Sequence, residues 1–169
     1  MTARPCQIIV TDANVLINLM HVSRLDMCAR LPDYQFVVPD HVQNEIANAE
    51  QRATLTDFVT RAILRIEPLT DIGALTLFTR LIVHLGRGEA ACLALAATNG
   101  WTIASDEKRR FRREAEALIG KGRIVRTPDL FVLAIRAGLM SIEEADADKA
   151  LLERHRFRMD FASFRDLVR

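Results

Sequence analysis

Short apolar segments rich in β-branched residues alternate along the chain with longer segments whose apolar residues recur at helical spacing. Candidate strands lie at residues 7–11 (QIIVT), 36–38, 64–66, 101–104 and 123–125. A strand in a parallel sheet is apolar on both faces, because helices cover both faces of such a sheet. The alternation therefore predicts an α/β fold, a three-layer α/β/α domain with a mostly parallel central sheet.

Helical periodicity fills the intervals between the candidate strands. We expect helices over residues 15–31, 40–50, 53–64, 71–85, from Glu89, from about Glu107, 128–137 and 142–154. Thr127 before Pro128 is typical of an N-cap, and Ser141 with Glu144 of a capping box. No linker or repeat is visible, so we expect a single domain over residues 1–169 whose C-terminal part, about 128–169, is helical.

The composition limits the class of protein without identifying it. Half of the 169 residues are hydrophobic, which suits one domain with a substantial core. The 23 Lys and Arg residues nearly balance the 22 Asp and Glu residues, so only local charge clusters can indicate a nucleic-acid partner. Cys6, Cys28 and Cys92 have neither disulfide nor zinc-site spacing. With no signal-peptide core or membrane-length apolar segment, we expect a cytoplasmic protein without a membrane partner.

Four carboxylates stand where predicted strands end or predicted helices begin. Asp12 follows the first strand and Asp106 follows the strand at 101–104, while Glu45 and Glu89 lie on helices that follow a strand or a glycine break. Ligands of open parallel sheets bind beyond the carboxyl ends of the strands, where these side chains are expected to meet. Carboxylates without Lys or His favour hard cations such as Mg²⁺ or Mn²⁺. The set therefore indicates metal-assisted phosphodiester chemistry.

Each carboxylate also has a purely structural interpretation. Asp12 can form an Asx turn, Asp106 can cap the next helix, Glu89 can stabilise the first turn of its helix, and Glu45 can be an exposed surface charge. Two other functions stay open at this point: a phosphatase or phosphoacceptor that uses a strand-end Asp as nucleophile, and a catalytically silent binding module. The four histidines show no spacing that favours histidine-based hydrolysis.

Four motifs in order carry a family resemblance. They are IIVTDANVLI around Asp12, VPDHVQNEI around Glu45, GRGEAACLALA around Glu89 and TIASDEKRR around Asp106. On these motifs the chain resembles the PIN-domain family, in particular the VapC-type toxin ribonucleases of bacterial and archaeal toxin–antitoxin pairs. The resemblance extends over nearly the whole chain.

The resemblance implies a metal-dependent endoribonuclease. Mg²⁺ or Mn²⁺ would be held by the four carboxylates and would activate a water for attack on an RNA phosphodiester. Asn14 and Ser105 would help to order the acidic centre. The resemblance further implies a homodimer and an antitoxin protein as partner. The metal ligands that it assigns are Asp12, Glu45, Glu89 and Asp106.

Two other segments are candidates for contacts with partners. The basic run at residues 108–113 would place Arg109 and Arg110 beside the acidic centre as RNA contacts, or would form a solvated helix face with Phe111 in the core. The tail from Glu153 is basic with interspersed Phe residues, and either packs against the core or binds a partner. Apolar residues of the first helix, namely Leu16, Leu19 and Met20, would line an antitoxin groove or belong to the core.

Overall fold

The computed structural model describes residues 6–168 and is built around a five-stranded sheet. The strands are β1 (Gln7–Thr11), β2 (Tyr34–Pro39), β3 (Arg65–Glu67), β4 (Thr102–Ala104) and β5 (Ile124–Val125). They lie in the order β3-β2-β1-β4-β5, and every strand pair in this sheet is parallel. The carboxyl ends of all five strands therefore point toward one edge of the sheet.

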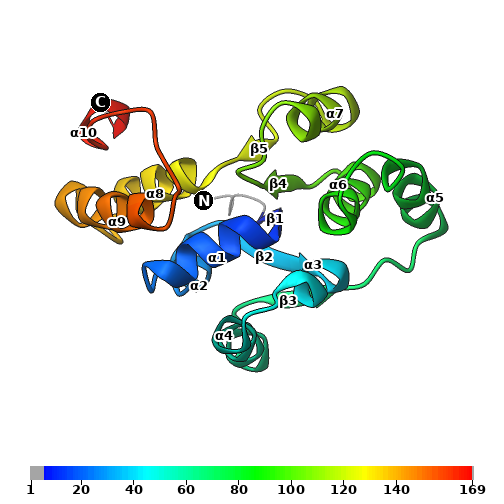
Figure 1. The fold of residues 1–169 in the computed structure, drawn as a ribbon, viewed down its shortest axis with the longest axis horizontal. Helices are drawn as coiled ribbons and strands as arrows, with labels where there is room; N and C mark the ends of the chain where they lie inside the picture. Colours follow the sequence, from blue (N-terminus) through cyan, green and yellow to red (C-terminus); the bar gives the residue numbers. More distant parts are fainter. Residues whose placement is uncertain (1–5, 169) are drawn as a thin grey trace, which may run out of the picture.

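Helices cover both faces of this sheet (Figure 1), which confirms the predicted three-layer α/β/α fold. One layer contains α1 (Ala13–His21), α2 (Met27–Arg30), α8 (Thr127–Arg136), α9 (Ile142–Arg154) and α10 (Arg165–Val168). The other contains α5 (Ile72–Leu81), α6 (Arg87–Asn99) and α7 (Arg110–Ile119). Between β2 and β3 the chain forms α3 (Asp40–Glu45) and α4 (Ala49–Thr60).

The core lies on both sides of the central strand, β1. Ile9 and Val10 of β1 have no exposed surface. Helix α6 packs against β1, β2 and β4, and its buried residues are small or apolar around most of its circumference, as a helix between layers requires. Phe164 near the C-terminus is also wholly buried, with the ring of Phe161 4.9 Å away between centroids. The aromatic part of the tail therefore packs against the core.

Two long helices expected from periodicity are each divided in the structure. The expected helix over 15–31 ends at His21, because Ser23 adopts a positive φ of 55°, and only the short α2 follows. The expected helix over 40–50 ends at Glu45, because Ile46 is extended and turns into the core. Asn48 then caps α4 by accepting a hydrogen bond from the Gln51 N–H. Local caps and burial therefore divide patterns that are continuous in the sequence.

In the second half of the chain, one helix start agrees with the prediction and two differ from it. The capping box at α9 is confirmed, with Ser141 and Glu144 each accepting a hydrogen bond from the other's backbone N–H. Thr127, however, is the first residue of α8 and not its N-cap, because its N–H and hydroxyl both donate to Asp106. Helix α7 begins at Arg110, three residues after the expected start.

Two further predictions concern a membrane-spanning segment and an exposed groove on the first helix. No helix within residues 6–168 combines the length and apolar character needed to cross a membrane. Leu16 and Leu19 have no exposed surface and belong to the core, so the expectation that they line an exposed groove is wrong. Met20 is partly exposed and borders a small groove between α1 and α4, with Phe58 on its other side.

Candidate metal and active site

Asp12 lies at the centre of the carboxyl edge of the sheet, directly after β1 and before α1. Its side chain caps α1 by accepting a hydrogen bond from the Ala13 N–H at 2.8 Å. Its second carboxylate oxygen accepts a hydrogen bond from the Ser105 hydroxyl at 3.2 Å. Only 4% of the residue is exposed, and burial raises the pKa of Asp12 to about 7, with Glu107 and Glu89 raising it further. Asp12 is thus a buried carboxylate beside other acids.

The turn after β4 brings Glu107 toward Asp12. The Ser105 hydroxyl, which donates to Asp12, also accepts a hydrogen bond from the Glu107 N–H at 3.2 Å. The side-chain amide of Asn14, in the first turn of α1, donates to the Glu107 carboxylate at 2.7 Å. Ser105 and Asn14 therefore join the turn after β1 to the turn after β4, and both contact carboxylates.

Glu45 reaches the same region by a close approach to the start of α6. Its carboxylate accepts a hydrogen bond from the Gly88 N–H at 2.7 Å, one of the free N–H groups at a helix N-terminus. A Cβ atom at position 88 would lie 2.3 Å from the Glu45 Oε2 atom, so only glycine leaves room for this approach. The glycine is required here by space and not by backbone conformation.

Glu89 occupies the first turn of α6 and completes the cluster. Its carboxylate accepts a hydrogen bond from the Gly86 N–H at 2.8 Å, so the first-turn stabilising role also holds. Burial raises the pKa of Glu89, the Gly86 hydrogen bond lowers it, and the charges of Glu107 and Glu45 raise it. Cys92, one turn further along α6, is wholly buried, and after burial itself the charges of Asp12, Glu45 and Glu89 raise the pKa of its thiol. The charges of Asp12, Glu45 and Glu89 therefore all act on the same buried position of α6 at this edge of the sheet.

Asp106 has a different environment from these acids. It is 8% exposed, and its carboxylate accepts hydrogen bonds from the Thr127 N–H at 2.9 Å, from the Thr127 hydroxyl and from the Asn18 side-chain amide at 3.0 Å. Burial raises its pKa, while these hydrogen bonds and the charge of Arg126 lower it. Asp106 does not cap α7, because the N-cap of that helix is Arg109. Its contacts join the turn after β4 to α1 and α8.

Glu107 is the acidic residue of this edge that the sequence pattern did not single out. It directly follows Asp106, and its charge raises the pKa of both Asp12 and Glu89. The sequence feature that could have indicated Glu107 is the pair of adjacent acids, Asp106 and Glu107, after a predicted strand. Their roles depend on the turn, in which Ser105 accepts from the Glu107 backbone while Asp106 turns inward to Thr127.

The potential metal-ligand atoms at this edge suit a hard divalent cation. Carboxylate oxygens predominate, and the side-chain oxygens of Thr11 and Asn14 are buried without a hydrogen-bond partner among the described residues. An acceptor such as the Asn14 Oδ1 atom suits a metal-bound water or a cation. Among residues 6–168, however, no three His, Cys, Asp or Glu side chains already stand in positions that would hold a metal ion. Binding would therefore require the glutamate side chains to turn inward.

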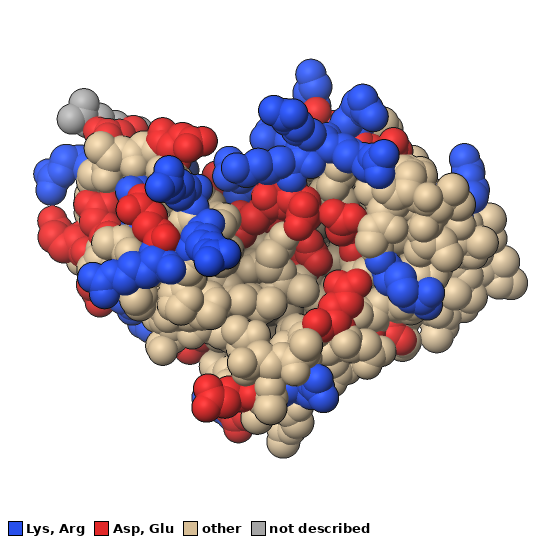
Figure 2. Space-filling view, viewed as in Figure 1, with Lys and Arg blue, Asp and Glu red and all other residues tan. Residues whose placement is uncertain are grey.

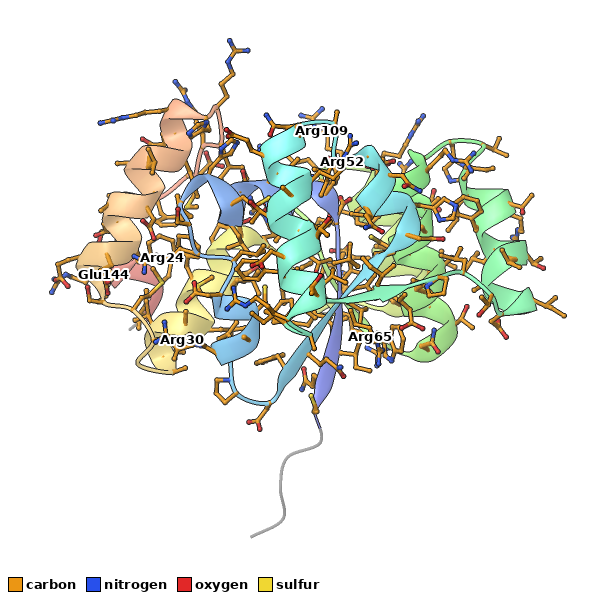
Figure 3. All side chains as sticks on the ribbon, turned by 90° about the horizontal axis from the view of Figure 1, so that it is seen from below. Arg24, Arg30, Arg52, Arg65, Arg109 and Glu144 are labelled. Carbon is orange, nitrogen blue, oxygen red and sulfur yellow. The ribbon has the colours of Figure 1, made fainter. Side chains whose placement is uncertain are left out.

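Basic side chains border the acidic edge. Figure 2 shows a central acidic group with Lys and Arg side chains on more than one side of it. Arg109 is exposed and has a positive φ of 47°, a conformation that costs free energy in a residue other than glycine. Figure 3 places Arg109 and Arg52 at one end of the molecule and Arg30 and Arg65 toward the other. Phe111, between the basic residues, is buried as the structural interpretation requires.

Arg110 and Arg52 make contacts of their own at this edge. Arg110 donates to the His84 carbonyl at 2.9 Å, and its charge lowers the pKa of Glu89. Arg52 donates to the carbonyls of Ile46 and Ala47, which satisfies the backbone between α3 and α4. Of the two predicted RNA contacts, Arg109 and Arg110, only Arg110 is already tied to the protein by a hydrogen bond within the described residues.

The parallel sheet, the acids at its carboxyl edge and the bordering cations define a nuclease-type fold. A family model described as a PIN domain matches residues 8–162, which is most of the chain. The chain therefore belongs to the PIN-domain family. No curated protein matches the chain at a significant level.

Proposed function

We propose that this PIN domain is a Mg²⁺- or Mn²⁺-dependent endoribonuclease. The observation that carries the proposal is that Asp12, Glu89 and Glu107 lie at one edge of the sheet, where burial raises the pKa values of Asp12 and Glu89 and the charges of neighbouring acids raise them further. Carboxylates that repel one another are stabilised by a cation between them. A silent binding module has no need of such a cluster, whereas a metal-dependent nuclease has.

The residues take separate roles in this proposal. Asp12, Glu45, Glu89 and Glu107 would hold the metal, which supplies an activated water and offsets phosphate charge when it is bound. The Ser105 hydroxyl holds Asp12 and the backbone of Glu107 next to each other through its two hydrogen bonds, and Asn14 orients the Glu107 carboxylate. Asp106, first expected to be a metal ligand, would instead fix the turn through Thr127 and Asn18. Arg109 would contact the RNA backbone.

Metal dependence is the first test. Cleavage of a labelled single-stranded RNA should require added Mg²⁺ or Mn²⁺ and should stop in excess chelator. Cleavage that continues unchanged in chelator would contradict the proposal. Binding of Mn²⁺ without cleavage of any RNA would favour the silent binding module.

The identity of the fourth ligand is tested by two isosteric variants. Glu107→Gln should weaken Mn²⁺ binding by about tenfold, equivalent to about 1.4 kcal/mol, because it removes a charged ligand while keeping an acceptor for Asn14. Asp106→Asn should change Mn²⁺ binding much less. The reverse order in calorimetric titrations would restore Asp106 as the ligand and exclude Glu107.

We also propose the role of toxin in a toxin–antitoxin pair, on the family resemblance and the hazard that a ribonuclease poses to its host. The groove beside Met20 and Phe58, with a volume of about 270 Å³, is a candidate binding site for an apolar side chain of the antitoxin. The protein would act as a homodimer. Expression alone should arrest growth, and co-expression with the adjacent gene should relieve the arrest. Harmless expression with no co-purifying partner would contradict the toxin role and leave the nuclease proposal intact.

A further inference from the structure

The C-terminal end of α9 and the turn after it form a second group of cations. Arg154, Arg156 and Arg158 are all exposed, and within residues 6–168 none of their guanidinium groups has an ion-pair or hydrogen-bond partner. Of the two acids in this segment, Glu153 is paired with Lys149 at 2.8 Å, and Asp160 is exposed. A cation at a helix C-terminus stabilises the helix, which accounts for Arg154. Arg156 and Arg158 lie beyond the helix and need another explanation.

A stacked pair of histidine rings lies in the same place. His155, the C-cap of α9, stacks on His21, the last residue of α1, with ring centroids 3.7 Å apart and planes 13° from parallel. Burial, and secondly the charge of His155, lower the pKa of His21, which favours the neutral ring. Because His155 is exposed, the pair offers a flat ring to solvent among the arginines.

Helix α1 links this basic segment to the acidic edge. Asp12 caps the first turn of α1 and His21 ends it, so the two sites are separated by about 13 Å of helix. In Figure 1 the end of α9 lies on the α1 side of the sheet, and α7 lies across the sheet from it. Figure 2 shows Lys and Arg side chains on both of these sides of the central acidic group.

We propose that residues 154–158 form a second contact site for single-stranded RNA, with phosphates on the arginines and a base stacked on His155. The inference rests on the proposed ribonuclease function and extends its substrate path from α7, across the acidic edge, to the end of α9. Single strands present alternating phosphates and flat bases, and cations alternating with a ring match that pattern. An acidic protein segment would bind to the cations but would have no base to stack on the His155 ring, so single-stranded RNA matches the site better.

The charge component is tested by two double variants that remove the same number of charges. One is Arg156→Gln with Arg158→Gln. The control is Arg123→Gln with Arg136→Gln, since both residues are exposed and line hollows at the opposite, amino edge of the sheet, near Gln7. Binding of a labelled single-stranded RNA is measured in excess chelator over a range of salt concentrations.

The first variant should bind RNA about tenfold more weakly, and the slope of its salt dependence should be shallower by about 0.7 for each phosphate that it no longer binds. The control should bind RNA as the parent does. Equal affinities and slopes for the two variants would overturn the inference. The inference would also be overturned if an acidic peptide bound to residues 154–158 and the single-stranded RNA failed to displace it.

The ring is tested by His155→Ala and His155→Phe. Alanine should weaken RNA binding about fivefold or more, and phenylalanine should restore it, because base stacking needs a flat ring and no charge. A duplex of the same sequence should bind the parent less tightly, since its bases are not free to stack. Melting temperatures check that both variants fold, and equal RNA binding by the alanine variant and the parent would exclude stacking.

A short substrate separates this inference from the proposed function. A dinucleotide spans the acidic edge without reaching α9, so the arginine variants should cleave it in Mn²⁺ at the rate of the parent. Failure of the parent to cleave any RNA would overturn the ribonuclease proposal, while the binding comparison would still decide whether residues 154–158 contact RNA.

Discussion

The turns after β1 and β4 each bury an aspartate, and the two aspartates differ in the charges and hydrogen-bond donors around them. Burial, followed by the charges of Glu107 and Glu89, raises the pKa of Asp12 to about 7, although the hydrogen bonds that it accepts from Ala13 and Ser105 lower it. Burial also raises the pKa of Asp106, but the three hydrogen bonds that it accepts from Thr127 and Asn18 and the charge of Arg126 act against this rise, and no neighbouring acid is among its main causes. Burial alone therefore does not distinguish the two carboxylates. The neighbouring charges and the hydrogen-bond donors do.

The largest expected difference between the two aspartates is in catalysis. Asp12→Asn should reduce metal-dependent RNA cleavage about a thousandfold or more, a loss of about 4 kcal/mol in transition-state stabilisation, because a central ligand charge disappears. Asp106→Asn should cost far less. Single-turnover cleavage rates at saturating Mn²⁺ measure both, and equal losses would remove the proposed difference between the two sites.

The stability of the metal-free protein should respond to pH through Asp12. Its folded-state pKa of about 7 lies above the ordinary value of 3.8, so ionisation opposes folding. The cost is absent below pH 4, grows as the pH rises between these values and is complete above 7, where it reaches up to about 4 kcal/mol. Asp12→Asn should remove this cost and stabilise the metal-free protein at pH 8.

Urea unfolding in chelator at pH 4 and pH 8 measures this effect. The free energy of unfolding of the parent should decrease relative to that of Asp12→Asn as the pH rises. A variant that is less stable than the parent at pH 8 would instead make Asp12 a structural N-cap.

Asp106 should show the complementary behaviour, a loss of stability. Asp106→Ala leaves the Thr127 N–H and the Asn18 amide buried without an acceptor, which should cost about 2 to 3 kcal/mol. The control is Glu107→Ala, which should cost little, because the exposed side chain of Glu107 accepts a hydrogen bond only from Asn14 among residues 6–168. Denaturant midpoints compare the two variants, and a stable Asp106→Ala protein that no longer binds Mn²⁺ would favour the metal-ligand role.

The smallest expected effect concerns the approach of Glu45 to α6. Gly88→Ala would put a Cβ atom 2.3 Å from Glu45 Oε2 and displace this carboxylate, so Mn²⁺ binding should weaken about tenfold. Stability should change little, since alanine favours the helix. Gly86→Ala is the milder control, because its Cβ would lie 3.3 Å from Glu89 Oε2. Unchanged Mn²⁺ binding in Gly88→Ala would show that the position of Glu45 is unimportant for the metal.

Much of the fold could be predicted because strands leave a local pattern. The β-branched segment at residues 7–11 became β1 with the expected bounds, and the other four candidate strands are present with shifts of one or two residues. Helix boundaries were harder, because Ser23 and Ile46 break continuous periodicity by conformation and burial. A periodic pattern does not record where the chain must turn.

The sequence by itself determined the α/β alternation and placed acids at the ends of β1 and β4, since both depend on residue type and order along the chain. Only the tertiary structure distinguished Asp106 from Glu107. The two acids are adjacent, and the donors that hold Asp106 come from Asn18 and Thr127, which are distant in sequence. The close packing of Glu45 on Gly88 was likewise decided in three dimensions. Hydrogen bonds and repulsion between charges depend on distances in space, which the order of residues does not specify.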